Sequence, residues 1–120
     1  MRKKKVKENE IQCRSYEFAL RVIRLVSVLP QTQTGKILGK QLLRAGTSIG
    51  ANVEEAIVAY SKNDFTNKMN IAQKEARESN YWLRLINDSE LVNKDKMKPI
   101  IQESEEITKI IASIVKTSRQ

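Results

Sequence analysis

Histidine is absent from this chain of 120 residues, and cysteine occurs only once, at Cys13. Without histidine the chain cannot form a serine–histidine–aspartate triad, and it lacks the commonest proton shuttle and metal ligand of proteins. A single cysteine excludes an intrachain disulfide and a thiolate zinc cluster. The chain also has no phosphate-binding loop and no dinucleotide-binding glycine motif. We therefore expect a protein that is not an enzyme and holds no cofactor and no metal.

Proline and glycine are scarce as well, with two and four residues, and aromatic residues make up 5% of the chain. No useful length of sequence alternates between apolar and polar residues as a strand would, and no apolar run approaches the roughly 18 residues of a membrane span. The basic N-terminus has no apolar run behind it, so it does not resemble a secretory signal. A lone cysteine suits a reducing compartment. These absences predict an all-α protein located in the cytoplasm, with no membrane partner.

Positive charge is what the chain has in excess, with 22 basic residues against 14 acidic residues and a net charge of +8. Residues 1–9 hold five of the basic residues and one of the acids, so half of the net charge lies in this short segment. We expect residues 1–9 to form a flexible basic tail and residues 10–120 to form one domain.

Apolar residues recur at helical spacing in four segments, which predicts helices over about residues 10–29, 34–60, 64–88 and 94–118. Pro30 ends the first segment, and the sequence SKND at 61–64 reads as the start of the third. Since short loops favour antiparallel neighbours, we predict an antiparallel up-down-up-down four-helix bundle. The apolar seams of the four segments are Ile11, Phe18, Val22, Leu25 and Leu29; Leu38, Leu42, Ala45, Ile49, Val53, Ala56 and Tyr60; Phe65, Met69, Ala72, Ala76, Leu83 and Ile86; and Met97, Ile100, Ile107, Ile111 and Ile114.

The second segment contains three glycines in its interior, Gly39, Gly46 and Gly50, besides Gly35 at its start, although each interior glycine costs a helix about 1 kcal/mol relative to alanine. Close approach of another helix is what readily offsets this cost, so we expect this helix to be buried on more than one side, in a bundle or at a subunit contact. A polar line runs beside the glycines. We predict that this polar line forms a structural hydrogen-bond network. The alternative is a groove that binds a ligand or phosphate. The members of the network are Arg44, Ser48, Asn52 and Glu55, joined by Glu78 of the third helix.

Cations also recur at helical spacing, in the second helix and in the third, where Tyr81 lies among them. Such stripes can follow a phosphate backbone, although a solvated charged face is the simpler interpretation. The candidate nucleic-acid-binding residues are Lys3, Lys4, Lys5, Lys36, Lys40, Arg44, Lys74, Arg77 and Arg84. For the carboxylates Glu75 and Glu78, one helical turn apart, we expect ion pairing rather than acid–base catalysis.

The segments RAGTSIGANVEEA (44–56) and SKNDFTNKMNIAQKEARESNYWLRLI (61–86) resemble the four-helix bundle proteins encoded in intervening sequences of some bacterial 23S rRNA genes. The chain is also similar to the accessory variability determinants of diversity-generating retroelements. The resemblance covers about residues 10–118. It implies a non-enzymatic protomer that assembles into a homo-oligomer, specifically a homopentamer. The retroelement relatives further imply a basic barrel that binds nucleic acid and a reverse transcriptase. Many family members have a proline where this chain has Gly50, which puts any proline-induced bend of the second helix in doubt.

Two hypotheses from different classes follow. The first is a non-enzymatic oligomeric bundle that binds structured RNA or DNA through its basic helix faces by neutralising phosphates, with little sequence preference. The second is a protein–protein interaction or scaffold module with no direct nucleic-acid role, in which the charge serves solubility. The position of the cations distinguishes the two hypotheses. Cations that face acids across a helix or subunit contact are not available to bind phosphate.

Overall fold

The computed structural model describes the backbone of residues 2–120 and the side chains of residues 6–120. The described backbone forms four helices: α1 (Arg2–Ser27), α2 (Gln33–Ile57), α3 (Lys62–Asp88) and α4 (Lys94–Arg119). Each of the last three begins with a polar side chain that accepts a hydrogen bond from the first turn, as N-caps do. These caps are Thr32, Ser61 and Asn93.

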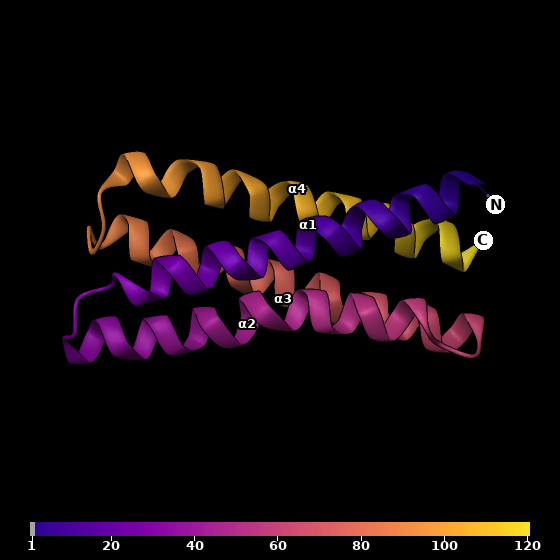
Figure 1. The fold of residues 1–120 in the computed structure, drawn as a ribbon, viewed down its shortest axis with the longest axis horizontal. Helices are drawn as coiled ribbons and strands as arrows, with labels where there is room; N and C mark the ends of the chain where they lie inside the picture. Colours follow the sequence, from indigo (N-terminus) through magenta and orange to yellow (C-terminus); the bar gives the residue numbers. More distant parts are fainter. Residues whose placement is uncertain (1) are drawn as a thin grey trace.

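The four helices lie along the long axis of a molecule measuring 46 × 22 × 19 Å (Figure 1). The backbones of α1 and α2, α2 and α3, α3 and α4, and α4 and α1 approach closely, and within the described residues the diagonal pairs do not. The helices therefore surround one shared core. The loops 28–32 and 89–93 lie at one end of the molecule, whereas loop 58–61 and both termini lie at the other end (Figure 1).

The core consists of the predicted apolar seams. Their members are buried almost throughout, which confirms the helical periodicity read from the sequence. Four residues differ. Leu25, Leu38 and Phe65 are only partly buried, and Tyr60 is fully exposed because α2 ends at Ile57, before it.

The glycines of α2 bring this helix close to α1. A Cβ atom on Gly46 would lie 2.8 Å from Cγ2 of Val22, and one on Gly39 would lie 3.1 Å from Cδ1 of Leu29. Side chains of α1 and of the loop directly after it thus occupy the space that side chains at these two positions would otherwise fill. The close approach predicted from the glycines lies between two helices of the same chain.

The N-terminal segment differs from the prediction. Residues 2–9 are the first turns of α1 rather than a tail without regular structure. Lysine, arginine and glutamate are good helix formers, and no glycine or proline separates this segment from the apolar seam that follows. Lys7 also donates a hydrogen bond from Nζ to Ser113 Oγ of α4 at 3.1 Å.

Candidate nucleic-acid interface

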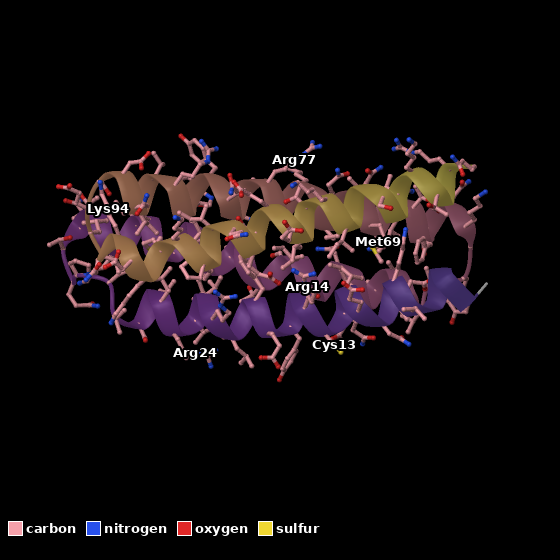
Figure 2. All side chains as sticks on the ribbon, turned by 90° about the horizontal axis from the view of Figure 1, so that it is seen from above. Cys13, Arg14, Arg24, Met69, Arg77 and Lys94 are labelled. Carbon is pink, nitrogen blue, oxygen red and sulfur yellow. The ribbon has the colours of Figure 1, made fainter. Side chains whose placement is uncertain are left out.

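The outer side of α3 carries three cations and an aromatic ring. Lys74, Arg77, Tyr81 and Arg84 are all exposed, at successive spacings of three, four and three residues. Residues so spaced share one side of a helix. Arg77 points away from the bundle (Figure 2). Within the described part of the chain, no carboxylate forms an ion pair with Lys74, Arg77 or Arg84. We call these four residues the α3 strip.

Arg84 is held by contacts with neighbouring side chains. Its Nε donates to Asn80 Oδ1 at 2.8 Å, and Asn80 Nδ2 donates to Ser104 Oγ on α4 at 2.9 Å. Ser104 is fully buried and donates in turn to the carbonyl oxygen of Ile101 at 2.6 Å. The guanidinium carbon of Arg84 also lies over the ring of Tyr81, 5.8 Å from its centroid. This series of contacts connects the surface arginine to the interior between α3 and α4.

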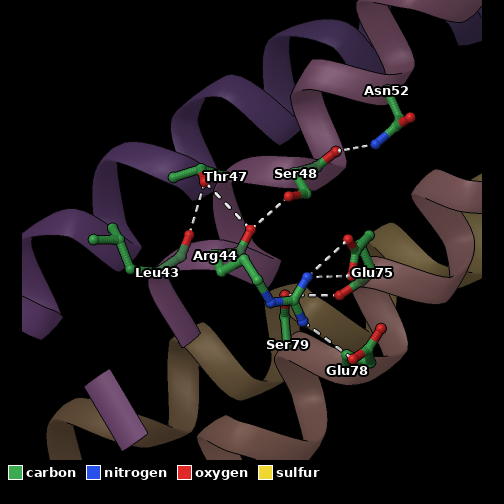
Figure 3. Close-up of polar contacts among 8 residues, drawn as sticks. All are labelled: Leu43, Arg44, Thr47, Ser48, Asn52, Glu75, Glu78 and Ser79. Atoms are coloured by element: carbon green, nitrogen blue, oxygen red, sulfur yellow. Dashed lines mark hydrogen bonds and ion pairs between the residues drawn. The ribbon is translucent and has the colours of Figure 1, made fainter. Parts of the chain in front are cut away.

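Arg44, which the sequence assigned both to the phosphate-binding set and to the structural network, faces α3. Its Nη1 lies 3.2 and 3.3 Å from the two carboxylate oxygens of Glu75, and its Nη2 lies 3.2 Å from Glu78 Oε1 (Figure 3). Two carboxylates therefore compensate one guanidinium at the α2–α3 contact. Phosphate would have to compete with both of them for Arg44.

Glu75 is the more buried of these two carboxylates. Its side chain is 12% exposed, against 37% for Glu78. Burial raises the pKa of Glu75 above its ordinary value, Glu78 raises it further, and Arg44 opposes the shift. The cluster of two acids and one arginine thus carries a partly buried negative charge. Ion pairing accounts for the contacts of both carboxylates.

The remaining members of the predicted polar network do not bond to one another's side chains. Ser48 Oγ donates to the carbonyl oxygen of Arg44 at 2.6 Å, and Asn52 Nδ2 donates to the carbonyl oxygen of Ser48 at 2.9 Å. Both bonds stay within α2, as they commonly do for short polar side chains in helices. Glu55 is exposed and has no such contact. The structure thus brings together Arg44, Glu75 and Glu78 across α2 and α3, and leaves Ser48, Asn52 and Glu55 outside that cluster.

The other predicted cations lie apart from the α3 strip. Lys36 and Lys40 are exposed on α2, without an ion pair to any described residue. The side chains of Lys3, Lys4 and Lys5 lie outside the described residues. No group of three His, Cys, Asp or Glu side chains that could hold a metal ion occurs among the side chains of residues 6–120.

One ion pair, that of Arg14 with Glu103, was not predicted from the sequence. Arg14 donates from Nη2 and Nε to the two oxygens of Glu103 on α4, at 2.7 and 3.0 Å. This paired geometry favours the charged guanidinium and raises the pKa of Arg14. The two residues are 89 positions apart, so no local spacing in the sequence could have revealed the contact.

Fold and surface together define a small all-α protein with a four-helix core and a row of unpaired cations on one helix. No helix in the described part of the chain is long and apolar enough to cross a membrane. The sequence profile described as "23S rRNA-intervening sequence protein" matches residues 7–113. The chain belongs to that family.

A solved structure supports the same assignment. It is the 1.70 Å crystal structure of a protein of unknown function from the S23 ribosomal protein family of Bacteroides thetaiotaomicron VPI-5482. The two chains are 44% identical and superpose with a TM-score of 0.86, over 92% of this chain and 98% of that one. A comparison with curated proteins found no match.

Proposed function

We propose that this protein binds RNA or DNA through the α3 strip, with little sequence preference and without catalysing a reaction. The observation that carries the proposal is the state of Lys74, Arg77 and Arg84, which are exposed, share one side of a helix and have no described acid as a partner. Unpaired cations in a row can neutralise successive phosphates and release their counterions. Phosphate contacts of this kind position a nucleic acid without reading its bases.

Lys36 and Lys40 form a separate group of proposed phosphate contacts on α2, whereas Arg44 is better assigned to the helix contact. Its guanidinium already has two carboxylates within 3.3 Å. The proposal therefore keeps Lys36 and Lys40 as phosphate contacts and gives Arg44 a structural role. Lys3, Lys4 and Lys5 add positive charge at the start of α1 and are kept as phosphate contacts to be tested separately.

The proposal can be tested by measuring the affinity for a labelled RNA hairpin and a DNA duplex across a salt series. The test variant replaces Lys74, Arg77 and Arg84 by glutamine. The matched control replaces three exposed cations of α1 and α4, Arg24, Lys109 and Lys116, and so changes the net charge equally. We expect the test variant to lose most of its affinity, and its plot of log affinity against log salt to flatten by up to about 3 slope units, at about 0.9 per phosphate contact.

Equal losses in the two variants would show that attraction by net charge, rather than the α3 strip, causes binding. No binding of the parent protein at low salt would favour the interaction module instead. A third variant with glutamine at Lys3, Lys4 and Lys5 separates the contribution of the N-terminal charge from that of the bundle.

Self-association as an interaction module is the second candidate, and exposed apolar residues on α1 and α2 favour it. Tyr16 and Ile23 of α1 are 59% and 47% exposed, and Leu43 of α2 is 37% exposed. Shallow grooves run between these two helices, lined by Tyr16 and Glu54 at one place and by Val26 and Leu43 at another. Apolar surface of this kind is typical of subunit contacts.

From the family resemblance we propose a homopentamer. We propose that each protomer has antiparallel up-down-up-down topology, which is supported by the position of successive loops at alternate ends of the molecule. Analytical ultracentrifugation tests the assembly. We expect Tyr16→Lys combined with Leu43→Lys to reduce the sedimenting mass to that of the monomer. Tyr60→Lys, at a fully exposed loop residue, is the matched control. A monomeric parent protein would contradict this second candidate.

A further inference from the structure

Three arginines are held in place by hydrogen bonds from their side chains, and Arg84 differs from the other two in what holds it. Arg14 and Arg44 bond to carboxylates, which compensate their charge. Arg84 bonds to the neutral amide oxygen of Asn80, and no carboxylate of the described residues forms an ion pair with it. The fold therefore fixes the position of this guanidinium and leaves its charge uncompensated.

Asn80 can hold Arg84 in only one orientation of its amide group. The Ser104 hydroxyl donates its hydrogen to the carbonyl oxygen of Ile101, so it must accept from Asn80. Asn80 then turns its Nδ2 toward Ser104 and its oxygen toward Arg84 Nε, which is itself only a donor. Because Ser104 is fully buried, the orientation of the amide depends on the core between α3 and α4. The two terminal nitrogens of Arg84 have no partner among the described residues.

Tyr81 forms the second part of the same surface. Its ring supports the guanidinium of Arg84 and meets the ring of Trp82 edge-on, with centroids 5.1 Å apart. Tyr81 is 48% exposed, so part of the ring remains open to a ligand. Proteins that bind single strands combine a cation for the phosphate with an aromatic ring for the base.

We propose that Arg84 and Tyr81 form a preorganised subsite for one unpaired nucleotide, in which Arg84 binds the phosphate through its terminal nitrogens and Tyr81 stacks against the base. This inference rests on the proposed nucleic-acid binding. It specifies that the α3 strip binds an unpaired strand rather than a duplex. A base within a duplex is covered on both faces by its neighbours and cannot reach the ring. Asn80 is the positioning residue, because it acts through Arg84.

Asn80→Asp is the sharpest test, since it places a carboxylate where the neutral amide now holds Arg84. The matched control is Asn67→Asp, which adds the same charge at an exposed position of α3, thirteen residues before Asn80. We expect Asn80→Asp to weaken binding of a labelled single-stranded oligonucleotide about tenfold, the effect of losing one charge-assisted contact. Asn67→Asp should weaken it less than about threefold, by general repulsion alone.

Two further variants test the subsite without altering its anchor. We expect Arg84→Gln to weaken single-strand binding about as much as Asn80→Asp does. Tyr81→Leu should weaken binding of the single strand about tenfold and leave binding of a duplex of the same sequence nearly unchanged. Oligonucleotides with a 5′-phosphate and with a 5′-hydroxyl distinguish a terminal phosphate from an internal one as the group that Arg84 binds. Both Arg84 and Tyr81 are exposed, so these variants should retain the fold, which circular dichroism checks.

Failure of the subsite and failure of the proposed function give different results. Two results would overturn the subsite and leave the α3 strip as a nonspecific phosphate contact. In the first, Asn80→Asp and Asn67→Asp weaken salt-sensitive binding of nucleic acid equally. In the second, Tyr81→Leu weakens binding of single strand and duplex equally. Absence of binding to any probe at low salt would overturn both.

Discussion

The two halves of the bundle are held together by different means. Between α1 and α2 the contact depends on shape, because glycines let the two helices approach until Val22 fills the space above Gly46. Between α3 and α4 the contact includes polar side chains in the interior, with Asn80 bonded to Ser104 and Thr66 bonded to Ser118. Close apolar packing tolerates little change in volume, whereas a polar contact tolerates little loss of a partner.

The comparison also separates the two candidate surfaces. The α1–α2 half carries the exposed apolar residues of the proposed subunit contact. The α3–α4 half carries the cations of the α3 strip. A polar contact can extend from the core to the surface, as it does from Ser104 through Asn80 to Arg84. Packing of small residues does not provide such a connection.

The largest expected effect is at Gly46. A Cβ there would lie 2.8 Å from a methyl group of Val22, which is fully buried and branched at Cβ. Overpacking costs about 1–3 kcal/mol and outweighs the helix-propensity gain of about 1 kcal/mol. We therefore expect Gly46→Ala to lower the free energy of unfolding by about 1–2 kcal/mol, as measured by urea denaturation.

Gly50 provides the matched control, one turn further along α2. A Cβ there would lie 3.3 Å from the Ser15 hydroxyl oxygen, a smaller overlap than at Gly46, so Gly50→Ala should be neutral or stabilising by up to about 1 kcal/mol. In addition, Val22→Ala should lower the free energy of unfolding less in the Gly46→Ala protein than in the parent protein. Additive effects of these two substitutions would show that the methyl groups do not meet.

The second prediction concerns the polar half. Ser104→Ala removes the acceptor of Asn80 and should lower the free energy of unfolding by about 1 kcal/mol. Ser113→Ala on the same helix, where the hydroxyl accepts only from the exposed Lys7, should cost almost nothing. Chemical denaturation of both variants measures the difference. If the two costs were equal, the buried hydrogen bond would contribute no more than the exposed one.

The smallest effect at neutral pH, and the most informative about charge, is expected at Glu75. Because the folded protein raises the pKa of Glu75, the folded state binds its proton more tightly than the unfolded state does. The corresponding stability is fully present below the unfolded pKa of about 4.3 and is lost as pH rises through the higher folded pKa. We therefore expect the melting temperature to fall less in Glu75→Gln than in the parent as the pH rises above the unfolded pKa.

The control for this prediction is Glu17→Gln, which makes the same change of charge at an exposed position of α1. Both variants lose one carboxylate, so the difference between their melting curves reports the partly buried cluster of Glu75, Glu78 and Arg44 rather than the loss of one charge. A pH dependence of Glu75→Gln that runs parallel to that of the parent would show that burial does not shift this carboxyl group.

Periodicity alone was enough to predict the helices and most of the core, because burial of a helix face imposes its spacing on the sequence. Ile11, Phe18 and Val22 illustrate this, since all three are fully buried as predicted. The glycines predicted close packing for a related reason, that their cost must be offset elsewhere. Neither signal specifies which helix is the neighbour.

Side-chain partners were harder to predict, because they depend on the register between helices. The sequence placed Arg44, Ser48 and Asn52 on one line, but only Arg44 reaches across to α3, and the other two bond to their own helix. Asn80 was missed for the same reason: nothing in its neighbourhood indicates that Ser104, 24 positions away, lies beside it. The cations of α3 were identified, but not the anchor that distinguishes Arg84.

Trp82 gives the protein an optical probe of its own. It is the single tryptophan of the chain, it meets Tyr81 edge-on, and the hydrogen on its indole nitrogen is buried without an acceptor among the described residues. Its fluorescence emission should be blue-shifted relative to indole in water and should respond to any molecule that settles on Tyr81. The same signal should also follow separation of α3 from the bundle on denaturation. Occupancy of the surface and integrity of the helix beneath it can therefore be followed without attaching a label.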